Sequence, residues 1–125
     1  RVVTDAGVAF IVDDMDNSAT DITTLNYHGV GTGVTAESAA QTALVTESTT
    51  VLNPDSTRAT GTKSQPSANI LRSVGTLTFD GSAAITEHGI FSQAATGGGT
   101  LLDRSLFAAI NVAAADSINL CGFAA

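Results

Sequence analysis

The feature that most constrains the fold is an alternation of apolar and polar residues in the second half of the chain. In "NILRSVGTLTF", residues 69–79, Leu71, Leu77 and Phe79 fall on one face of an extended strand, because successive side chains of a strand point to opposite faces. The other face carries Arg72, Thr76 and Thr78 together with Ile70 and Val74. This period of two predicts a long strand with one face in a core.

Three more strand-like segments follow at about ten-residue spacing, a pattern typical of all-β sandwiches and barrels. They span residues 83–93, 101–112 and 118–125, and the turn-forming stretches "DGS", "AATGGGT" and "AAADS" separate the four segments. The "DGS" turn, residues 80–82, has the composition of a tight hairpin. We therefore expect the four strands to form an antiparallel meander.

The first half of the chain predicts shorter elements. Residues 6–14 and 21–29 read as strands, "TESTTVLN" as a further possible strand, and residues 35–45 as a short helix capped by Thr35. Residues 53–68 contain both prolines and are expected to form a long loop. The predicted fold is an all-β, antiparallel, jelly-roll-like β-sandwich with one short helix.

Two parts of the chain are distinguished by their sequence. Residues 1–24 are expected to form an N-terminal strand or arm that contacts a neighbouring molecule, and residues 25–125 to form the β-sandwich domain. A chain of 125 residues is long enough to bury a core in one domain.

Composition excludes several classes of partner. Only 14% of the residues are charged, and five basic and twelve acidic side chains give a net charge of −7. Nucleic acids and anionic membrane surfaces require a basic footprint, so we expect neither as a partner. No apolar run approaches the roughly 20 residues of a membrane span. The single cysteine, Cys121, cannot form an internal disulfide and is expected to be a small buried hydrophobe.

The glycine-rich stretch "NYHGVGTGVTAES", residues 26–38, resembles a phosphate loop at first sight. Gly29, Gly31 and Gly33 follow a G-x-G-x-G spacing, whereas dinucleotide sites use G-x-G-x-x-G and P-loops end in Gly-Lys-Ser/Thr. Glu37 near the start of the expected helix would also repel a phosphate. We therefore interpret the glycines as positions where the backbone bends or is closely approached.

An acidic stretch offers a possible calcium loop. Asp14, Asp16 and Ser18 alternate as calcium ligands would, but Ala19 and Leu25 stand where such a loop needs glycine and glutamate. A solvated turn is the preferred interpretation, and weak calcium binding is the alternative.

No other pattern indicates a catalytic, cofactor or metal site. His28 and His88 could share a metal, but no spacing suggests a third ligand, so both are interpreted as structural. There is no G-x-S-x-G nucleophile elbow. Glu87 and Arg104 lie on strands joined by one turn, and we expect a shielded ion pair that fixes the register, with the side chains within about 6 Å.

A longer string of ordered features carries a family resemblance. "NYHGVGTGVTAESAAQTALVTE" and then "SANILRSVGTLTFDGSAAITEHGIFSQAATGGGTLLDRSLFAAINVAAADSI" resemble small virion structural proteins of tailed bacteriophages, over residues 25–118. In that group a segment like "YHGVGTG" precedes a strand, a turn and "ITE.G.F..A..GG.LLDR". The resemblance implies a β-sandwich without catalytic residues. Related sequences look like capsid cement (decoration) proteins and like tail or fibre components.

The resemblance leads to one expected function and two alternatives. We expect a cofactor-free, non-enzymatic capsid cement protein on the outer surface of the phage capsid. It would bind the major capsid protein as a homotrimer near three-fold positions, with residues 1–21 and 53–68 as the contacts. The alternatives are a tail-fibre or receptor-binding module that recognises the host surface, and a small carbohydrate-active enzyme with two carboxylates about 5–10 Å apart.

Overall fold

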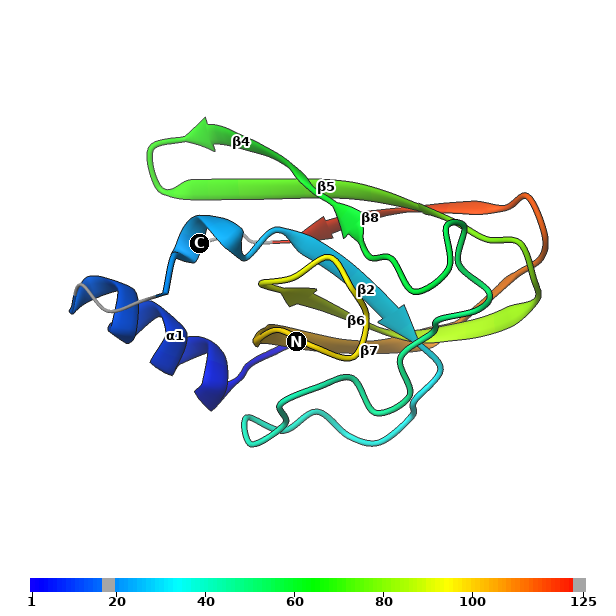
Figure 1. The fold of residues 1–125 in the computed structure, drawn as a ribbon, viewed down its shortest axis with the longest axis horizontal. Helices are drawn as coiled ribbons and strands as arrows, with labels where there is room; N and C mark the ends of the chain where they lie inside the picture. Colours follow the sequence, from blue (N-terminus) through cyan, green and yellow to red (C-terminus); the bar gives the residue numbers. More distant parts are fainter. Residues whose placement is uncertain (17–19, 123–125) are drawn as a thin grey trace.

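The computed structural model describes residues 1–16 and 20–122 as two antiparallel sheets that face each other, with one α-helix at one end (Figure 1). The five-stranded sheet has the order β1 (Val2–Val3), β7 (Leu101–Val112), β6 (Ala83–Phe91), β2 (Tyr27–Gly31) and β3 (Ala59–Thr60). The three-stranded sheet has the order β4 (Thr62–Ser67), β5 (Ile70–Thr78) and β8 (Ser117–Gly122). The helices are α1 (Asp5–Met15) and the 3-10 turn η1 (Ile22–Thr24). The prediction of an all-β, sandwich-like fold is confirmed.

The main core lies between the two sheets. The alternation predicted for residues 69–79 is confirmed along β5, where Ser73, Gly75 and Leu77 are buried and Arg72 is exposed. The buried apolar side chains of this core are Val30, Leu52, Leu77, Phe79, Ile85, Val112 and Leu120. Each sheet therefore contributes one apolar face to a shared interior.

The predicted four-stranded meander is wrong, although β6 and β7 do form a hairpin. β5 pairs with β4 and β8, so the "DGS" turn and the turn after β7 both cross from one sheet to the other. The two crossings lie side by side, because Phe79 N–H donates to the Asp116 carbonyl and Ala115 N–H donates to the Phe79 carbonyl. Leu77 and Phe79 pack across the interior against Ile85, which a flat hairpin between β5 and β6 would not allow.

The predicted strand over residues 6–14 is wrong, because this segment is the helix α1. Thr4 caps it, its hydroxyl accepting from Gly7 N–H at 3.0 Å. Gly7 packs directly on β7, where an added Cβ would lie 2.8 Å from Leu102 Cα. Phe10 and Ile11, at helical spacing from Gly7, pack against a second cluster of Leu25, Ile90 and Leu102. Within residues 1–24, β1 pairs with β7 and α1 covers the end of the sandwich; contact with a neighbouring molecule stays a prediction.

Four further local expectations are corrected by the structure. The strand expected over residues 21–29 begins only at Tyr27, after the 3-10 turn η1. Residues 35–45 form turns and bends and no helix, and the expected loop over residues 53–68 contains β3 and β4. The stretch "TESTTVLN" has only isolated bridges, at Glu47 and Leu52. Residues 32–48, which we call the outer segment, lie against the face of the five-stranded sheet that points away from the main core. Leu44 anchors this segment in a third cluster with Tyr27, Phe91 and Leu101.

Candidate functional site

The alternating glycines are close-approach positions on the outer face of β2, as interpreted from the sequence. A Cβ added to Gly31 would lie 2.5 Å from Glu87 Oε2, and one added to Gly33 would lie 2.6 Å from the same oxygen. A Cβ on Gly29 would lie 2.9 Å from Glu47 Oε2. Side chains cannot occupy these positions without displacing a buried carboxylate, so the stretch holds carboxylates of its own chain.

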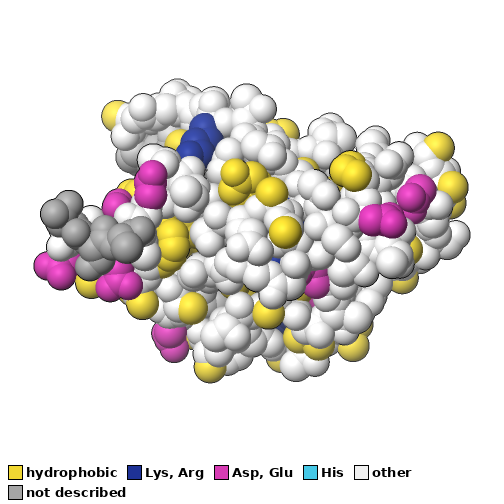
Figure 2. Space-filling view, viewed as in Figure 1, with side chains coloured by type: hydrophobic (Ala, Val, Ile, Leu, Met, Phe, Trp, Pro, Cys, Tyr) yellow, Lys and Arg dark blue, Asp and Glu magenta, His cyan; other side chains and the backbone are white. Residues whose placement is uncertain are grey.

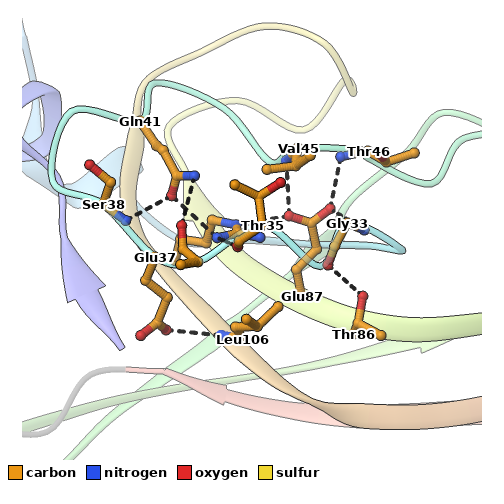
Figure 3. Close-up of polar contacts among 12 residues, drawn as sticks. Gly33, Thr35, Glu37, Ser38, Gln41, Val45, Thr46, Thr86, Glu87 and Leu106 are labelled. Atoms are coloured by element: carbon orange, nitrogen blue, oxygen red, sulfur yellow. Dashed lines mark hydrogen bonds and ion pairs between the residues drawn. The ribbon is translucent and has the colours of Figure 1, made fainter.

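Glu87 is the centre of the network in Figure 3. Its carboxylate accepts backbone N–H bonds from Gly33 at 2.9 Å, Val45 at 2.9 Å and Thr46 at 2.8 Å. Arg104 Nε donates to Glu87 Oε1 at 2.9 Å, and both side chains are fully buried. The predicted proximity of this pair is confirmed. The pair also fastens the outer segment to β6, a role that the sequence did not reveal.

The electrostatics of this network keep Glu87 ionised. Burial alone would raise the pKa of Glu87, but the three backbone donors and the Arg104 guanidinium together lower it below its ordinary value. Arg104 Nη1 also donates to the Thr35 carbonyl at 2.8 Å and to Gln41 Oε1 at 3.3 Å. Arg104 Nη2 is buried without a partner among the described residues.

A second ion pair, between the partly buried Glu47 and the buried Arg58, was missed in the sequence. Arg58 Nε and Nη2 donate to the two carboxylate oxygens at 2.7 and 2.9 Å, which is a bidentate pair. Arg58 Nη1 donates to the carbonyls of Gln93 and Gly98, and the guanidinium lies 3.4 Å over the Phe91 ring. The sequence carries no local signal for this pair, because an arginine in an expected loop is ordinarily solvated and only its burial creates the need for a partner.

The two histidines meet on the inner face of the five-stranded sheet. His28 Nδ1 lies 2.9 Å from His88 Nε2, and His28 Nε2 lies 2.9 Å from Ser73 Oγ. Ser73 Oγ donates to Asn26 Oδ1 at 2.7 Å. The Asn26 amide nitrogen donates to the Gly61 carbonyl, so its oxygen must accept. The proton order is thereby assigned: His88 donates to His28, His28 to Ser73, and Ser73 to Asn26.

Both histidines are held neutral. Burial lowers the pKa of His28 to about 4. Burial, followed by the nearby His28 and Arg1, lowers the pKa of His88 to about 3. Because both ring nitrogens of His28 and Nε2 of His88 are engaged in a chain that ends on the Gly61 carbonyl, the arrangement orders the interior. It offers Ser73 no free base, since the serine hydroxyl already donates to an amide.

The remaining sequence candidates do not converge. Asp14 lies on α1 and Asp16 is its C-cap, whereas Ser18 and Ala19 lie outside the described residues. In the part of the chain that the structure describes, no three His, Cys, Asp or Glu side chains are grouped to hold a metal ion. Cys121 is exposed, which corrects the prediction of a buried thiol: neighbouring strand residues point to opposite faces, and it is Leu120 that points inward.

The surface grooves include two that border the elements described above. One, of about 360 Å³, lies between α1, η1 and the β4–β5 hairpin and is lined mainly by apolar side chains. The other, of about 280 Å³, runs along β8 beside β7, with His88 and Cys121 in its wall. Glu87, which is buried, and Glu47, which is partly buried, each bind an arginine and accept hydrogen bonds from backbone N–H groups. These arrangements can fix loops and offer surfaces for contact.

Comparison of the chain with protein-family models, with curated proteins and with solved structures gives no match. Among the described residues, no helix has the length and apolar character needed to span a membrane.

Proposed function

We propose that this chain is a capsid cement protein that binds the outside of a tailed-phage head and stabilises it without catalysis. The observation that carries the proposal is the ordered resemblance over residues 25–118 to small phage virion proteins. The major capsid protein is the proposed partner. The proposed location is the outer surface of the virion, with three copies gathered near three-fold positions of the lattice.

The way the chain uses its charges supports a structural role. The ion pairs of Glu47 with Arg58 and of Glu87 with Arg104 hold irregular segments in place. The contact between His28 and His88 orders the interior. The exposed surface is left rich in hydroxyl and small side chains, which cost less to bury at a contact than charges do. It also carries unpaired strand edges along β4 and β8.

Cement action requires only binding. A protein that binds the assembled shell and not its dissociated subunits stabilises the shell by mass action, and this stabilisation grows with its concentration. No bond is made or broken in that process, so it needs no cofactor and no catalytic group.

The test is reconstitution. Purified chain is added to heads of the cognate phage that lack it, and bound protein is measured after sedimentation. We expect saturable binding at a fixed ratio to the major capsid protein and a higher temperature of shell disruption. Heads that bind no protein would contradict the proposal. Binding confined to tails in electron micrographs would replace it with the tail-fibre function.

A further inference from the structure

The end of the molecule that carries α1 combines an apolar groove with an exposed apolar helix stripe. The groove lies between α1, η1 and the overhanging β4–β5 hairpin, with Ile11, Ile22, Leu25, Leu71 and Leu102 in its wall. Ile22 and Leu71 remain about 40% exposed (41% and 44%) even though they line it. A groove of this kind, open and apolar, is a surface that another molecule covers in many proteins.

The helix extends this apolar surface. Val8, Val12 and Met15 share one side of α1 at i, i+4 and i+7, and they are 49%, 54% and 80% exposed. Ile11, which lines the groove, is three residues after Val8 and four before Met15, so the stripe and the groove are continuous. We call the groove together with this stripe the α1 face.

The positions of the exposed charged side chains indicate which molecule covers the α1 face. Arg1, Arg58 and Arg104 pair with carboxylates of the same chain. The two remaining basic side chains, Lys63 and Arg72, are both exposed on the β4–β5 hairpin. Lys63 lines the groove, whereas Arg72, next to Ser73 on β5, points to the opposite face of the hairpin.

The acidic counterpart lies across the same groove. Asp5, Asp13 and Asp14 belong to α1 and Asp16 caps its end, with no basic residue in its last turn. Figure 2 shows magenta carboxylates around α1, dark-blue atoms beneath the hairpin and yellow apolar side chains at the same end of the molecule. Among the described residues, the other exposed basic residue is Arg1, which already pairs with Glu37 and Asp103 of its own chain. A contact between copies is therefore electrostatically most favourable where the hairpin of one meets an acidic region such as α1 of the other.

We propose that copies of this chain contact one another head to tail through the α1 face, so that the apolar stripe of one copy covers the groove of the next and Lys63 in that groove approaches the carboxylates of the first copy's α1. This inference rests on the proposed assembly function, which requires copies to gather on a lattice. It places the contact between copies on residues 8–15 and on the hairpin, and so departs from the expectation that residues 1–21 and 53–68 contact the capsid. The opposite end of the sandwich and the β8 edge stay available for the shell.

The experiment measures the mass of the purified chain by native mass spectrometry and light scattering over a dilution series. We expect wild-type protein to form a defined oligomer, and Val12→Glu and Met15→Glu to raise its dissociation constant about tenfold or more, because they bury a charge in the contact. Val34→Glu is the matched control, since Val34 is 73% exposed in the outer segment, away from the α1 face. It should leave the oligomer unchanged.

A second pair of variants tests the charges. Lys63→Gln removes a charge from the groove but keeps a donor for the Thr23 carbonyl, to which Lys63 donates. Arg72→Gln removes the same charge from the other side of the hairpin. We expect the first to weaken the oligomer several-fold more than the second, and high salt to reduce this difference. Circular dichroism of every variant checks that the fold is retained.

Three outcomes would overturn the inference: a monomeric wild-type chain, oligomers unaffected by Val12→Glu and Met15→Glu, or equal weakening by Val34→Glu. Head binding separates this result from the proposed function. A monomer that still binds heads would leave the cement function standing and remove only the contact between copies. An oligomer that binds no heads would support the contact between copies and contradict the cement function.

Discussion

The two faces of the five-stranded sheet are covered in different ways. The inner face packs on the other sheet through apolar side chains and contains the neutral pair of His28 and His88. The outer face is covered by an irregular segment, residues 32–48, which is held by the ion pairs of Glu87 and Glu47 with arginines. Three glycines of the β2 region make room for these carboxylates.

The difference follows from where backbone hydrogen bonds can go. A sheet that packs on another sheet satisfies its backbone donors within its own ladder, so its side chains can be apolar. An irregular segment laid on a sheet brings backbone N–H groups without ladder partners, and burying them unpaired costs about 1–3 kcal/mol each. The Glu87 carboxylate accepts hydrogen bonds from three of these N–H groups, those of Gly33, Val45 and Thr46.

The largest expected effect comes from removing the Glu87 carboxylate, which accepts these three hydrogen bonds. Glu87→Leu leaves the Arg104 charge buried without its partner, and we expect a loss of about 3–5 kcal/mol in the free energy of unfolding, measured by urea titration. Hydrogen exchange should increase first in residues 32–48. Asp55→Leu is the control, because the exposed Asp55 carboxylate forms no ion pair among the described residues. Equal losses in both variants would contradict a special role for the outer-face pair.

The inner face should respond to acid. The pKa of His28 is about 4 and that of His88 about 3 in the folded chain, against about 6.5 when unfolded. The unfolded chain therefore binds more protons below pH 6.5, and stability falls as the pH falls. From about pH 7.5 to about pH 5 we expect a loss of about 2 kcal/mol per histidine.

The pH response is isolated by comparing wild type with His88→Asn. Arg1 and Asp103 also lie near this pair, and burial raises the pKa of Asp103, so the variant is needed to subtract their contribution. The unfolding free energy of His88→Asn should change less between the two pH values. An identical pH dependence in both proteins would show that the histidines are not buried neutral groups.

A smaller effect is expected from a single methyl group on the outer face. Gly31→Ala forces the Glu87 carboxylate or Thr46 to move, and we expect a loss of about 1–3 kcal/mol in chemical denaturation. Gly81→Ala is the matched control, since its Cβ would meet Val51 at an ordinary 3.4 Å. If Gly31→Ala proves as harmless as Gly81→Ala, the close approach at β2 is not tight.

The smallest expected effect lies in the hydrogen-bond chain of the inner face. Ser73→Ala removes the link between His28 and Asn26, and we expect a loss of about 1 kcal/mol, measured by thermal unfolding. Ser82→Ala, at an exposed position of the turn before β6, serves as the control. A loss as large as that of Glu87→Leu would mean that the two faces do not differ in the way described.

The sequence predicted the elements whose own periodicity decides them. β5 and β7 lie close to their expected bounds, because alternation along a half-buried strand is local information. The crossing turns were mistaken for hairpins, since Asp80 and Gly81 fit either connection. The apolar run after Thr4 is short enough to suit strand or helix, and packing on Leu102 decided the outcome. The Glu87–Arg104 contact could be foreseen from neighbouring strands, whereas Glu47 with Arg58 depends on two irregular segments that no local pattern brings together.

The glycine track on β2 has a consequence for tracing descent. Gly29, Gly31 and Gly33 exist to admit Glu47 and Glu87, and each of these glutamates needs its own arginine. Loss of a glutamate or an arginine leaves the charge of its partner unpaired, and a side chain in place of a glycine displaces a carboxylate. The seven positions should therefore be inherited together even where the surface residues have changed. A spaced pattern of three glycines, two glutamates and two arginines would then identify distant homologues whose overall sequence identity to this chain is too low to reveal them.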